Sequence, residues 1–227
     1  YGTGMNALAF YRNVQDFRVT AGATVGADLK ISPSYPKSPW MTFTYDCSTG
    51  VKGSGDKLYL YATDLAPLAQ MRGTFAVDRS PKTVECSNKF GAYTCAWEFC
   101  EYLKSNGIEV TGKAADVDSQ GMVRTELGES SSVPAKSGSE RKQLGISYSP
   151  QISRISYITN QRSDNFYAEA LLRVLAKKKL GSADYESCTM VASDAIRRLG
   201  LDPSTGMYLV DGSGLSRKNL VSPEFFC

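Results

Sequence analysis

The stretch that decides the fold is Gln161-Arg162-Ser163-Asp164-Asn165-Phe166-Tyr167-Ala168-Glu169-Ala170-Leu171-Leu172-Arg173-Val174-Leu175, in which small polar residues stand directly before a helical pattern. Residues three or four positions apart fall on one face of the predicted helix: Tyr167, Leu171, Val174 and Leu175. Lys177-Lys178-Lys179 end the pattern, where positive charge suits the negative end of the helix dipole. By themselves Ser163, Asp164 and Asn165 are typical helix-capping residues, and a Ser-x-Asn match alone is weak evidence of function.

Two further segments flank this pattern. The first is Tyr148-Ser149-Pro150-Gln151-Ile152-Ser153, and the second is Val210-Asp211-Gly212-Ser213-Gly214-Leu215-Ser216-Arg217-Lys218-Asn219-Leu220-Val221-Ser222-Pro223. Together with residues 163–169 they resemble the D-Ala-D-Ala carboxypeptidase/endopeptidase family, the low-molecular-mass class C group of penicillin-binding proteins. In that family a Ser-Pro-x-x-Ser segment precedes Ser-(Asp/Asn)-Asn-(Leu/Phe)-Tyr-Ala-Glu, and an Asp-Gly-Ser-Gly-Leu-Ser-Arg turn follows about fifty residues later. Three matches in this order are far more specific than any one of them.

The composition is ordinary for a soluble globular protein. Of 227 residues, 42% are hydrophobic and 22% charged, which is enough for one large domain or two smaller ones with a real core. The formal charge of +3 is too small to indicate a nucleic-acid partner, and no apolar run reaches membrane-spanning length. There is no signal-peptide pattern and the sequence starts at Tyr1, so we expect a piece of a longer protein.

The sequence contains no histidine, which excludes Ser-His-Asp and Cys-His nucleophile systems and every metal site that needs imidazole. Six cysteines include no Cys-x-x-Cys pair, so we expect no structural zinc; they are Cys47, Cys86, Cys95, Cys100, Cys188 and Cys227. Cys95, Cys100 and Cys188 lie in helical patterns among apolar neighbours, where a free cysteine acts as a small hydrophobe. Disulfides need an oxidising compartment, and the sequence does not pair the cysteines. We expect neither a metal nor a cofactor.

Residues 1–85 show the alternation that is typical of strands. Apolar residues recur at every second position in three places: Phe17 and Val19; Met41, Phe43 and Tyr45; and Leu58, Leu60 and Ala62. Residues 72–77 predict one more strand. Pro33, Pro36 and Pro39 and two glycine-containing segments lie between these patterns and indicate turns.

Residues 92–105 predict a helix, with Gly107 as its stop. One face of this helix holds Ala92, Ala96, Phe99 and Leu103. Residues 108–110 predict a short strand after it.

Residues 126–143 are rich in serine, glycine and charge, which indicates a connector or exposed hairpin, with the main boundary near residue 145. Residues 184–199 then predict another helix, which Gly200 ends. Its buried face is expected to hold Cys188, Val191, Ala195 and Leu199. Residues 207–210 predict a short strand that enters the Asp211-Gly212-Ser213-Gly214 turn.

The resemblance implies an α+β fold in which β-rich inserted domains are followed by part of a β-lactamase/transpeptidase-like α/β domain. Residues 1–145 look like most of the insertion, with a small α/β unit. Residues 146–227 look like a partial serine transpeptidase-like domain that carries the Ser-Asp-Asn motif. Tyr1-Gly2 and Ala7-Leu8 also match the family's Tyr-Tyr-Gly-Ala…Ala-Leu stretch loosely.

The resemblance also implies a nucleophilic serine in a Ser-x-x-Lys motif on a helix ahead of the insertion, and a Lys-Thr-Gly motif after the turn. Ser-x-x-Lys occurs at Ser34, Ser54 and Ser139, and Lys136-Ser137-Gly138 imitates the third motif. Pro36 breaks any helix at Ser34, Ser54 lies in a glycine turn, and Lys136-Ser137-Gly138 stands before Ser163 instead of after it. We interpret all four as solvated loop residues. We therefore expect both motifs to be absent from residues 1–227 and the chain alone to be inactive.

For the complete enzyme, the resemblance implies an acyl-enzyme mechanism in which the lysine of Ser-x-x-Lys removes the serine proton. Ser163 would relay a proton to the departing D-Ala amine, and Asn165 would donate its amide to the carbonyl of the bound peptide. Asp164 is expected to cap the helix. Arg217 would contact a substrate carboxylate or brace the turn, and Ser213 is likewise a candidate for substrate contact or for fixing the turn. Asp211, Gly212 and Gly214 are expected to fix the turn, the two glycines through positive φ.

The partners that the resemblance implies are peptidoglycan peptide stems and β-lactam antibiotics, in the periplasm or cell envelope of a bacterium. Three alternatives stay open. A class A β-lactamase shares Ser-Asp-Asn but leaves the β-rich leader unexplained. A non-catalytic peptidoglycan-binding or inhibitor-like protein would have lost its nucleophile, and a soluble α/β domain would carry the matches by coincidence. The choice between carboxypeptidase and endopeptidase action, the diamino acid of the substrate and the oligomeric state do not follow from the sequence.

Overall fold

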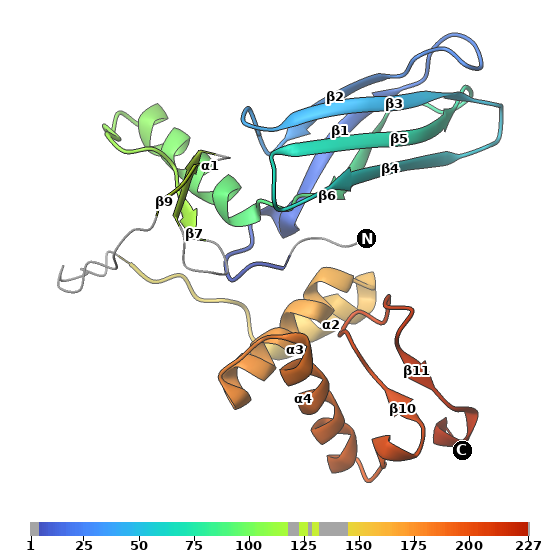
Figure 1. The fold of residues 1–227 in the computed structure, drawn as a ribbon, viewed down its shortest axis with the longest axis vertical. Coiled ribbons are helices and arrows are strands. Elements are labelled where there is room, and N and C mark those ends of the chain that lie inside the picture. Colours follow the sequence, from blue (N-terminus) through green and yellow to red (C-terminus); the bar gives the residue numbers. More distant parts are fainter. Residues whose placement is uncertain (1–4, 118–122, 127–128, 132–144, 227) are drawn as a thin grey trace. The chain divides into compact units, whose positions relative to one another are not determined.

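The computed structural model describes residues 5–117, 123–126, 129–131 and 145–226, and its backbone divides into two compact units, residues 1–140 and 141–227. Figure 1 shows the elements of each unit. The predicted connector, residues 126–143, lies outside the described residues except for 126 and 129–131, so the boundary near residue 145 stays a prediction. Tyr1-Gly2 and Lys136-Ser137-Gly138 lie outside them too.

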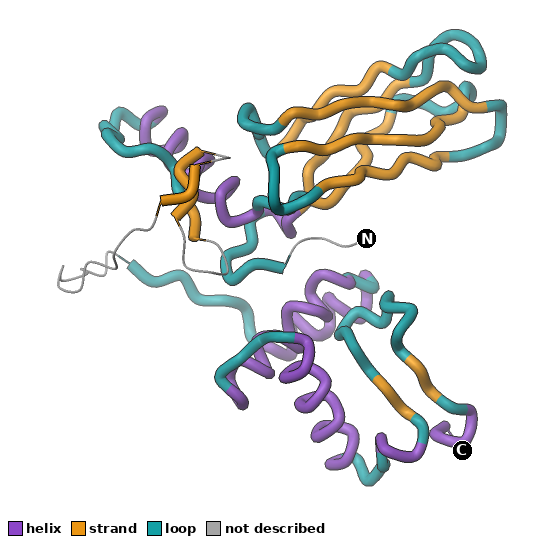
Figure 2. The backbone as a smooth tube through the Cα atoms, in the orientation of Figure 1, coloured by secondary structure: helices purple, strands orange, loops and turns teal. Residues whose placement is uncertain are grey.

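Two larger three-stranded sheets make up most of the first unit (Figure 2), and a third, of short strands, has the order β7-β8-β9. One of the larger sheets has the order β2-β1-β6 and is antiparallel throughout; its strands are β1 (Val14–Thr20), β2 (Lys30–Tyr35) and β6 (Lys82–Ser87). The other has the order β3-β5-β4; its strands are β3 (Thr42–Gly50), β4 (Asp56–Ala62) and β5 (Leu68–Ala76). In the second sheet β3 pairs with β5 in parallel, and β4 pairs with β5 antiparallel. The predicted strands around Phe17, Phe43, Leu58 and residue 72 are confirmed.

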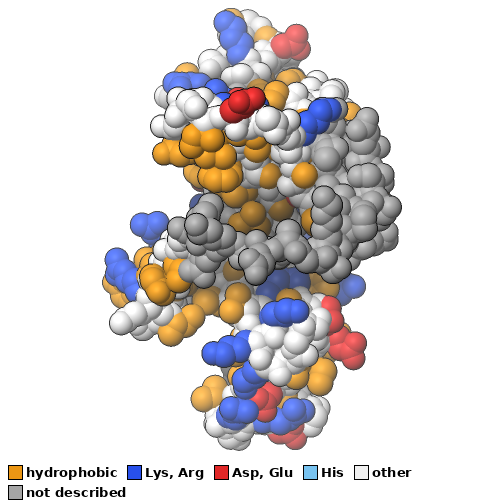
Figure 3. Space-filling view, turned by 90° about the vertical axis from the view of Figure 1, so that its left-hand side faces the viewer, with side chains coloured by type: hydrophobic (Ala, Val, Ile, Leu, Met, Phe, Trp, Pro, Cys, Tyr) orange, Lys and Arg blue, Asp and Glu red, His pale blue; other side chains and the backbone are white. Residues whose placement is uncertain are grey.

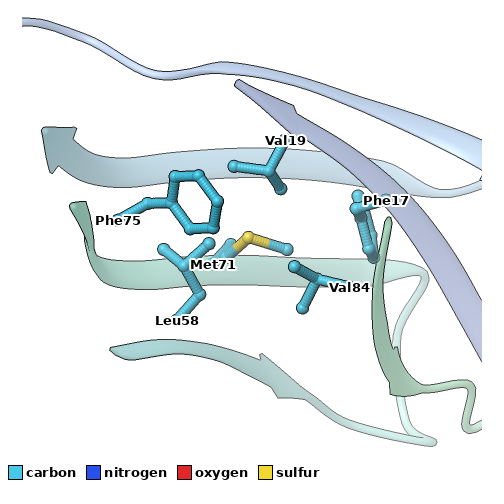
Figure 4. Packing of buried hydrophobic residues seen from close by; sticks show 6 residues of the cluster. All are labelled: Phe17, Val19, Leu58, Met71, Phe75 and Val84. Carbon is cyan, nitrogen blue, oxygen red and sulfur yellow. The ribbon is translucent and has the colours of Figure 1, made fainter. Parts of the chain in front are cut away.

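A hydrophobic core is formed where alternate side chains of these strands meet, as Figure 4 shows. Its fully buried members are Phe17, Val19, Met71 and Phe75, and Leu58 and Val84 complete the cluster. Each such side chain contributes about 1.5–3 kcal/mol when it leaves water. The period-two pattern of the sequence therefore corresponds to one buried face on each sheet.

Strand β2 corrects one expectation. Pro33 was expected in a turn, but it lies inside β2 and pairs with Phe17 of β1. Proline has no N–H to donate, so it is tolerated only at a sheet edge, and β2 is an edge strand of its sheet.

Helix α1 (Gly91–Ser105) is present as predicted, and Gly107 follows it with a φ of 77°. The expected face is partly wrong, because Ala96 packs against the buried cluster of this region but Phe99 is 59% exposed. The helix packs chiefly through Tyr93, Trp97 and Cys100 in the cluster that contains Trp40, since the aromatic side chains cover more apolar surface than alanine does. Residues 108–110 form no strand. The remaining short elements of this unit are η1 (Tyr11–Asn13), β7 (Asp116–Val117), β8 (Val123–Glu126) and β9 (Glu129–Ser131).

The second unit contains three helices and a two-stranded ribbon (Figures 1 and 2). The helices are α2 (Ile152–Arg162), α3 (Asn165–Leu180) and α4 (Tyr185–Arg198). The ribbon pairs β10 (Met207–Tyr208) with β11 (Leu220–Val221), and 3-10 turns precede and follow it at η2 (Pro203–Thr205) and η3 (Pro223–Phe226). The predicted helices at 163–179 and 184–199 are confirmed, whereas α2 was not predicted.

The core between α3 and α4 is small. Ala176, Cys188 and Val191 are buried in it, and Leu172 packs against them. The expected faces are therefore partly wrong, because four of their residues are exposed: Val174, Leu175, Ala195 and Leu199. The small side chain of Ala176 allows α4 to approach α3 closely, which places the contact on the Leu172–Ala176 side of α3.

Charged side chains of both signs are interspersed with hydrophobic ones on the face that Figure 3 shows. Among the described residues, no helix combines the length and the apolar character that crossing a membrane requires.

Candidate functional site

The residues at 163–165 form a sharp junction between two helices. Helix α2 ends at Arg162, and Ser163 takes a left-handed conformation with φ 50° and ψ 48°. The N–H of Asp164 donates to the carbonyl of Thr159 at 3.0 Å, which closes the end of α2. The Asp164 carboxylate then accepts from the N–H of Tyr167 at 3.0 Å and caps α3, as the sequence predicted.

The side chains on either side of Asp164 have no such structural use. Ser163 is exposed and Asn165 is half-buried in the first turn of α3. Within the described part of the chain, neither side chain makes a hydrogen bond. A hydroxyl and a carboxamide two positions apart are therefore available to a ligand at this helix start.

The second segment folds around Asp211. The Asp211 carboxylate accepts four hydrogen bonds: one oxygen from the Gly214 N–H at 3.0 Å and Asn219 Nδ2 at 2.7 Å, the other from Ser213 Oγ at 2.8 Å and the Ser216 N–H at 3.0 Å. Partial burial alone would raise the pKa of Asp211, but these hydrogen bonds to the charged form outweigh it and hold the pKa below its usual value. Asp211 is therefore the ionised centre of the turn.

Asn219 holds this loop together, and this role was not predicted from the sequence. Its Oδ1 accepts from the Val210 N–H at 2.8 Å while its Nδ2 donates to Asp211. The signal was the lone asparagine at the end of the Asp-Gly-Ser-Gly-Leu-Ser-Arg-Lys-Asn run, since a side chain with both a donor and an acceptor can close a loop from both ends.

Gly212 and Gly214 of the turn are glycines for different structural reasons. Gly214 has a φ of 76°, as predicted. Gly212 does not have positive φ, so that expectation is wrong. A side chain is excluded there by contact instead, because a Cβ on Gly212 would lie 2.6 Å from the backbone oxygen of Ala168 and 3.0 Å from Cβ of Leu172. The turn is thus seated directly on α3.

Glu169 joins the two segments. Its Oε2 accepts from the N–H of Gly212 at 2.7 Å, and its Oε1 is bound by Arg173 one turn later on α3. Glu169 belongs to the helix pattern of residues 161–175, which by itself predicts no role for it. The structure therefore brings the 163–165 junction and the 211–217 turn together on one helix.

Arg217 is exposed at the end of the turn. Its side chain makes no ion pair or hydrogen bond with any residue in the described ranges. Bracing of the turn is done by Asp211 and Asn219 instead. Ser213 both donates to Asp211 and accepts from the Leu215 N–H at 3.3 Å, so its contacts lie within the turn.

The Ser-x-x-Lys sequences lie outside helices where they are described. Ser34 belongs to strand β2, and Ser54 lies in the turn before β4, where its N–H donates to Val51 at 3.1 Å. Ser139 and Lys142 lie outside the described residues.

No cluster of three or more histidine, cysteine, aspartate or glutamate side chains in the described ranges is arranged to hold a metal. The described cysteines, all free thiols, are Cys47, Cys86, Cys95, Cys100 and Cys188; Cys227 lies outside the described residues. Burial raises the pKa of Cys86 to about 12. Cys188, 1% exposed, packs as the small hydrophobe that the sequence predicted.

Comparisons with known proteins identify relatives of this chain. A model of the D-Ala-D-Ala carboxypeptidase 3 (S13) family matches residues 1–227. The D-alanyl-D-alanine carboxypeptidase of Actinomadura sp. (strain R39) is 28% identical over 176 residues, which cover 78% of this chain and 30% of that protein. A match along the whole chain contradicts the alternative that the motif matches are coincidental.

Two crystal structures of penicillin binding protein 4 from Haemophilus influenzae, one complexed with a β-lactam, each match with a TM-score of 0.64. They are 19% and 20% identical and cover 97% and 94% of this chain, but 46% and 43% of their own chains. The chain thus spans less than half the length of these relatives. The predicted α+β fold class is confirmed, and it is the fold of a penicillin-binding protein.

Proposed function

The chain belongs to the D-Ala-D-Ala carboxypeptidase 3 (S13) family, and from this membership we propose that residues 1–227 are part of a serine peptidase of bacterial peptidoglycan. In the proposed reaction a serine hydroxyl attacks the carbonyl between two D-Ala residues, or another bond that follows a D-residue, and the amine leaves. Water then hydrolyses the ester. Penicillins acylate the same serine. The location that fits this substrate is the periplasm or cell envelope.

The observation that carries the proposal is the conformation of Ser163. Glycine is the usual residue in a left-handed helix end, and a residue with a Cβ costs roughly 1–2 kcal/mol there. Ser163 keeps this conformation while its hydroxyl makes no hydrogen bond with any described residue. Strain of this kind is typical of functional sites, which supports a role for the hydroxyl itself.

The proposed roles follow from the chemistry of each group. Ser163 relays a proton between the general base and the departing amine, because a hydroxyl can donate and accept at once. Asn165 donates its amide to the carbonyl of the bound peptide. Arg217 binds a substrate carboxylate, which its exposure and its lack of a partner among the described residues support. Ser213 reaches substrate only if it leaves Asp211, so we assign its contacts chiefly to the turn.

We further propose that the nucleophile and the Lys-Thr-Gly motif belong to parts of the protein outside residues 1–227. Two observations support this. The chain covers 30% of the Actinomadura carboxypeptidase, and Ser34 and Ser54 lie on no helix.

Intact mass after incubation with benzylpenicillin tests the proposal. We expect one penicilloyl adduct on a longer protein that contains this chain and none on residues 1–227 alone. Ser163→Ala in the longer protein is expected to slow acylation by about 100-fold, the effect of losing a positioned proton relay, with Ser182→Ala, a serine of the α3–α4 connection, as the matched control.

The other outcomes separate the alternatives. An adduct on residues 1–227 would show that one of their own serines is the nucleophile. No adduct on either protein would favour the non-catalytic peptidoglycan-binding protein. Rapid release of the adduct with fast turnover of penicillin would favour a β-lactamase.

A further inference from the structure

We propose that Glu169 is a positioning residue that fixes the loop carrying Arg217 against the helix that begins at Asn165. The inference rests on the proposed function, because it concerns how the same site is held together. Asn165, Glu169 and Arg173 follow one another at intervals of four on α3, so they lie along one face of the helix.

Glu169 uses both of its carboxylate oxygens. Oε1 accepts from Nε and Nη2 of Arg173, each at 2.9 Å, and Oε2 accepts from the backbone N–H of Gly212 at 2.7 Å. The side chain is only 13% exposed. A largely covered carboxylate whose two oxygens both accept hydrogen bonds holds one orientation, and its hydrogen bond to an amide is of the stronger, charge-assisted kind.

Arg173 is fixed in turn by two other contacts. Its Nη1 donates to the carbonyl of Ala183 at 2.7 Å, and its guanidinium lies 4.7 Å from the ring centre of Tyr185 at the start of α4. The arginine therefore ties α3 to the beginning of α4, and Glu169 is attached to a rigid part of the unit.

The loop has little freedom where Glu169 meets it. Gly212 lies so close to α3 that even a methyl group would contact Ala168 and Leu172. The N–H of Gly212 needs a hydrogen-bond acceptor at this position. A carboxylate can accept from Arg173 with one oxygen and from Gly212 with the other, which no other side chain does. A glutamine of the same shape would turn an amide donor toward one of these two donors.

The consequence for the site is geometric. Arg217 follows Gly212 in the same loop, and Asn165 precedes Glu169 by one helical turn. A displacement of about 1 Å between two substrate-binding groups can cost about 100-fold in rate. Glu169 thus acts on the substrate through the loop, without touching it.

Amide hydrogen exchange tests the contact. In Glu169→Gln we expect the N–H of Gly212 to exchange about tenfold faster or more than in the wild type, because its acceptor is lost or competes with a donor. Glu186→Gln is the matched control, since Glu186 is exposed on α4 and has no partner in the described part of the chain; it should leave Gly212 unchanged. Unchanged exchange in Glu169→Gln would overturn the proposal.

A double-mutant cycle in the longer protein tests the effect on substrate. Glu169→Gln and Arg217→Ala should each lower kcat/KM for a D-Ala-D-Ala peptide, and the double variant should lose little more than Arg217→Ala alone. Effects that multiply would show that Glu169 acts independently of Arg217, which contradicts the proposal. A wild type that cleaves no peptide would overturn the proposed function, whereas the exchange measurement alone decides whether Glu169 holds the loop.

Discussion

The Asn219 side chain donates a 2.7 Å hydrogen bond to the carboxylate of Asp211, and through its other end accepts one of 2.8 Å from the chain just before that aspartate. Asn219 therefore closes a loop of which Asp211 is the centre. The loop has no sheet of its own beyond the two-residue strands β10 and β11. Side-chain hydrogen bonds, instead of backbone pairing between strands, therefore hold this loop in its conformation.

Removing Asn219 should loosen this loop. We expect Asn219→Ala to lower the free energy of unfolding of the second unit by about 2 kcal/mol, because a hydrogen bond to a charged group and a bond to a backbone N–H are both lost. Urea denaturation measures the change. Lys218→Ala is the control, since its exposed side chain makes no hydrogen bond or ion pair in the described ranges and its removal should change stability by less than about 0.5 kcal/mol. Equal losses in both variants would contradict the prediction.

The negative charge of Asp211 predicts that the stability of the fold decreases at acid pH. Its pKa is lowered in the folded protein, so its ionised form stabilises the fold. This contribution is fully present above the ordinary aspartate pKa of about 3.9 and is lost as the pH falls through the lower folded-state value. The stability difference between the wild type and Asp211→Asn should therefore be largest near neutral pH and shrink toward pH 3. Asp184, Asp194 and Asp202 also have lowered pKa values. Their contributions to the pH dependence are the same in both proteins, so they cancel in the stability difference between the wild type and Asp211→Asn. A gap that is constant with pH would refute the assignment.

Gly212 should not tolerate a methyl group. The nearest atom to a new Cβ is a backbone oxygen, which cannot move aside as a flexible side chain can. We expect Gly212→Ala to destabilise the second unit by about 1–3 kcal/mol, the usual cost of overpacking. Gly145→Ala serves as the control, because a Cβ there meets nothing within 4 Å and its φ is not positive. Thermal unfolding of the two variants distinguishes steric exclusion from a general effect of alanine.

The thiol of Cys86 should resist modification in the folded protein. Burial raises its pKa to about 12, so the reactive thiolate is almost absent at pH 8. We expect iodoacetamide to label Cys86 slowly in the native state and quickly in urea, as followed by peptide mass spectrometry. Labelling at the same rate in both conditions would show that the hydrophobic core of the first unit does not protect the Cys86 thiol.

The sequence predicts best where local and tertiary signals agree. Asp164 caps α3 and Asp184 caps α4, and each cap stands at the start of a long helical pattern, so these helices were found at nearly their observed bounds. Helix α2 has no side-chain cap at Gln151 and few buried residues. It depends on packing against α3, which no local pattern reveals.

In the candidate site, too, the contacts between residues close in sequence could be predicted and those between distant residues could not. Residue types alone predicted Asp164 as a cap and Asp211 as the anchor of the turn, because both use hydrogen bonds to residues close in sequence. The contact between Glu169 and Gly212 joins residues far apart in the sequence, and the exclusion of a Cβ at Gly212 depends on the helix beneath it. Such relations exist only after the chain has folded.

The strand order β3-β5-β4 also determines when the two large sheets of the first unit can be completed during synthesis. Strands β3 and β4 are synthesised before β5, yet they do not pair with each other, and each pairs only with β5. The first sheet is likewise incomplete until β6 joins β1. In a nascent chain that stops before residue 68, the partners of β1, β3 and β4 are therefore missing, and both sheets can be completed only after residues 68–87 have been synthesised. Ribosomal pausing just before that point would prolong the stage at which these strands are open to wrong partners.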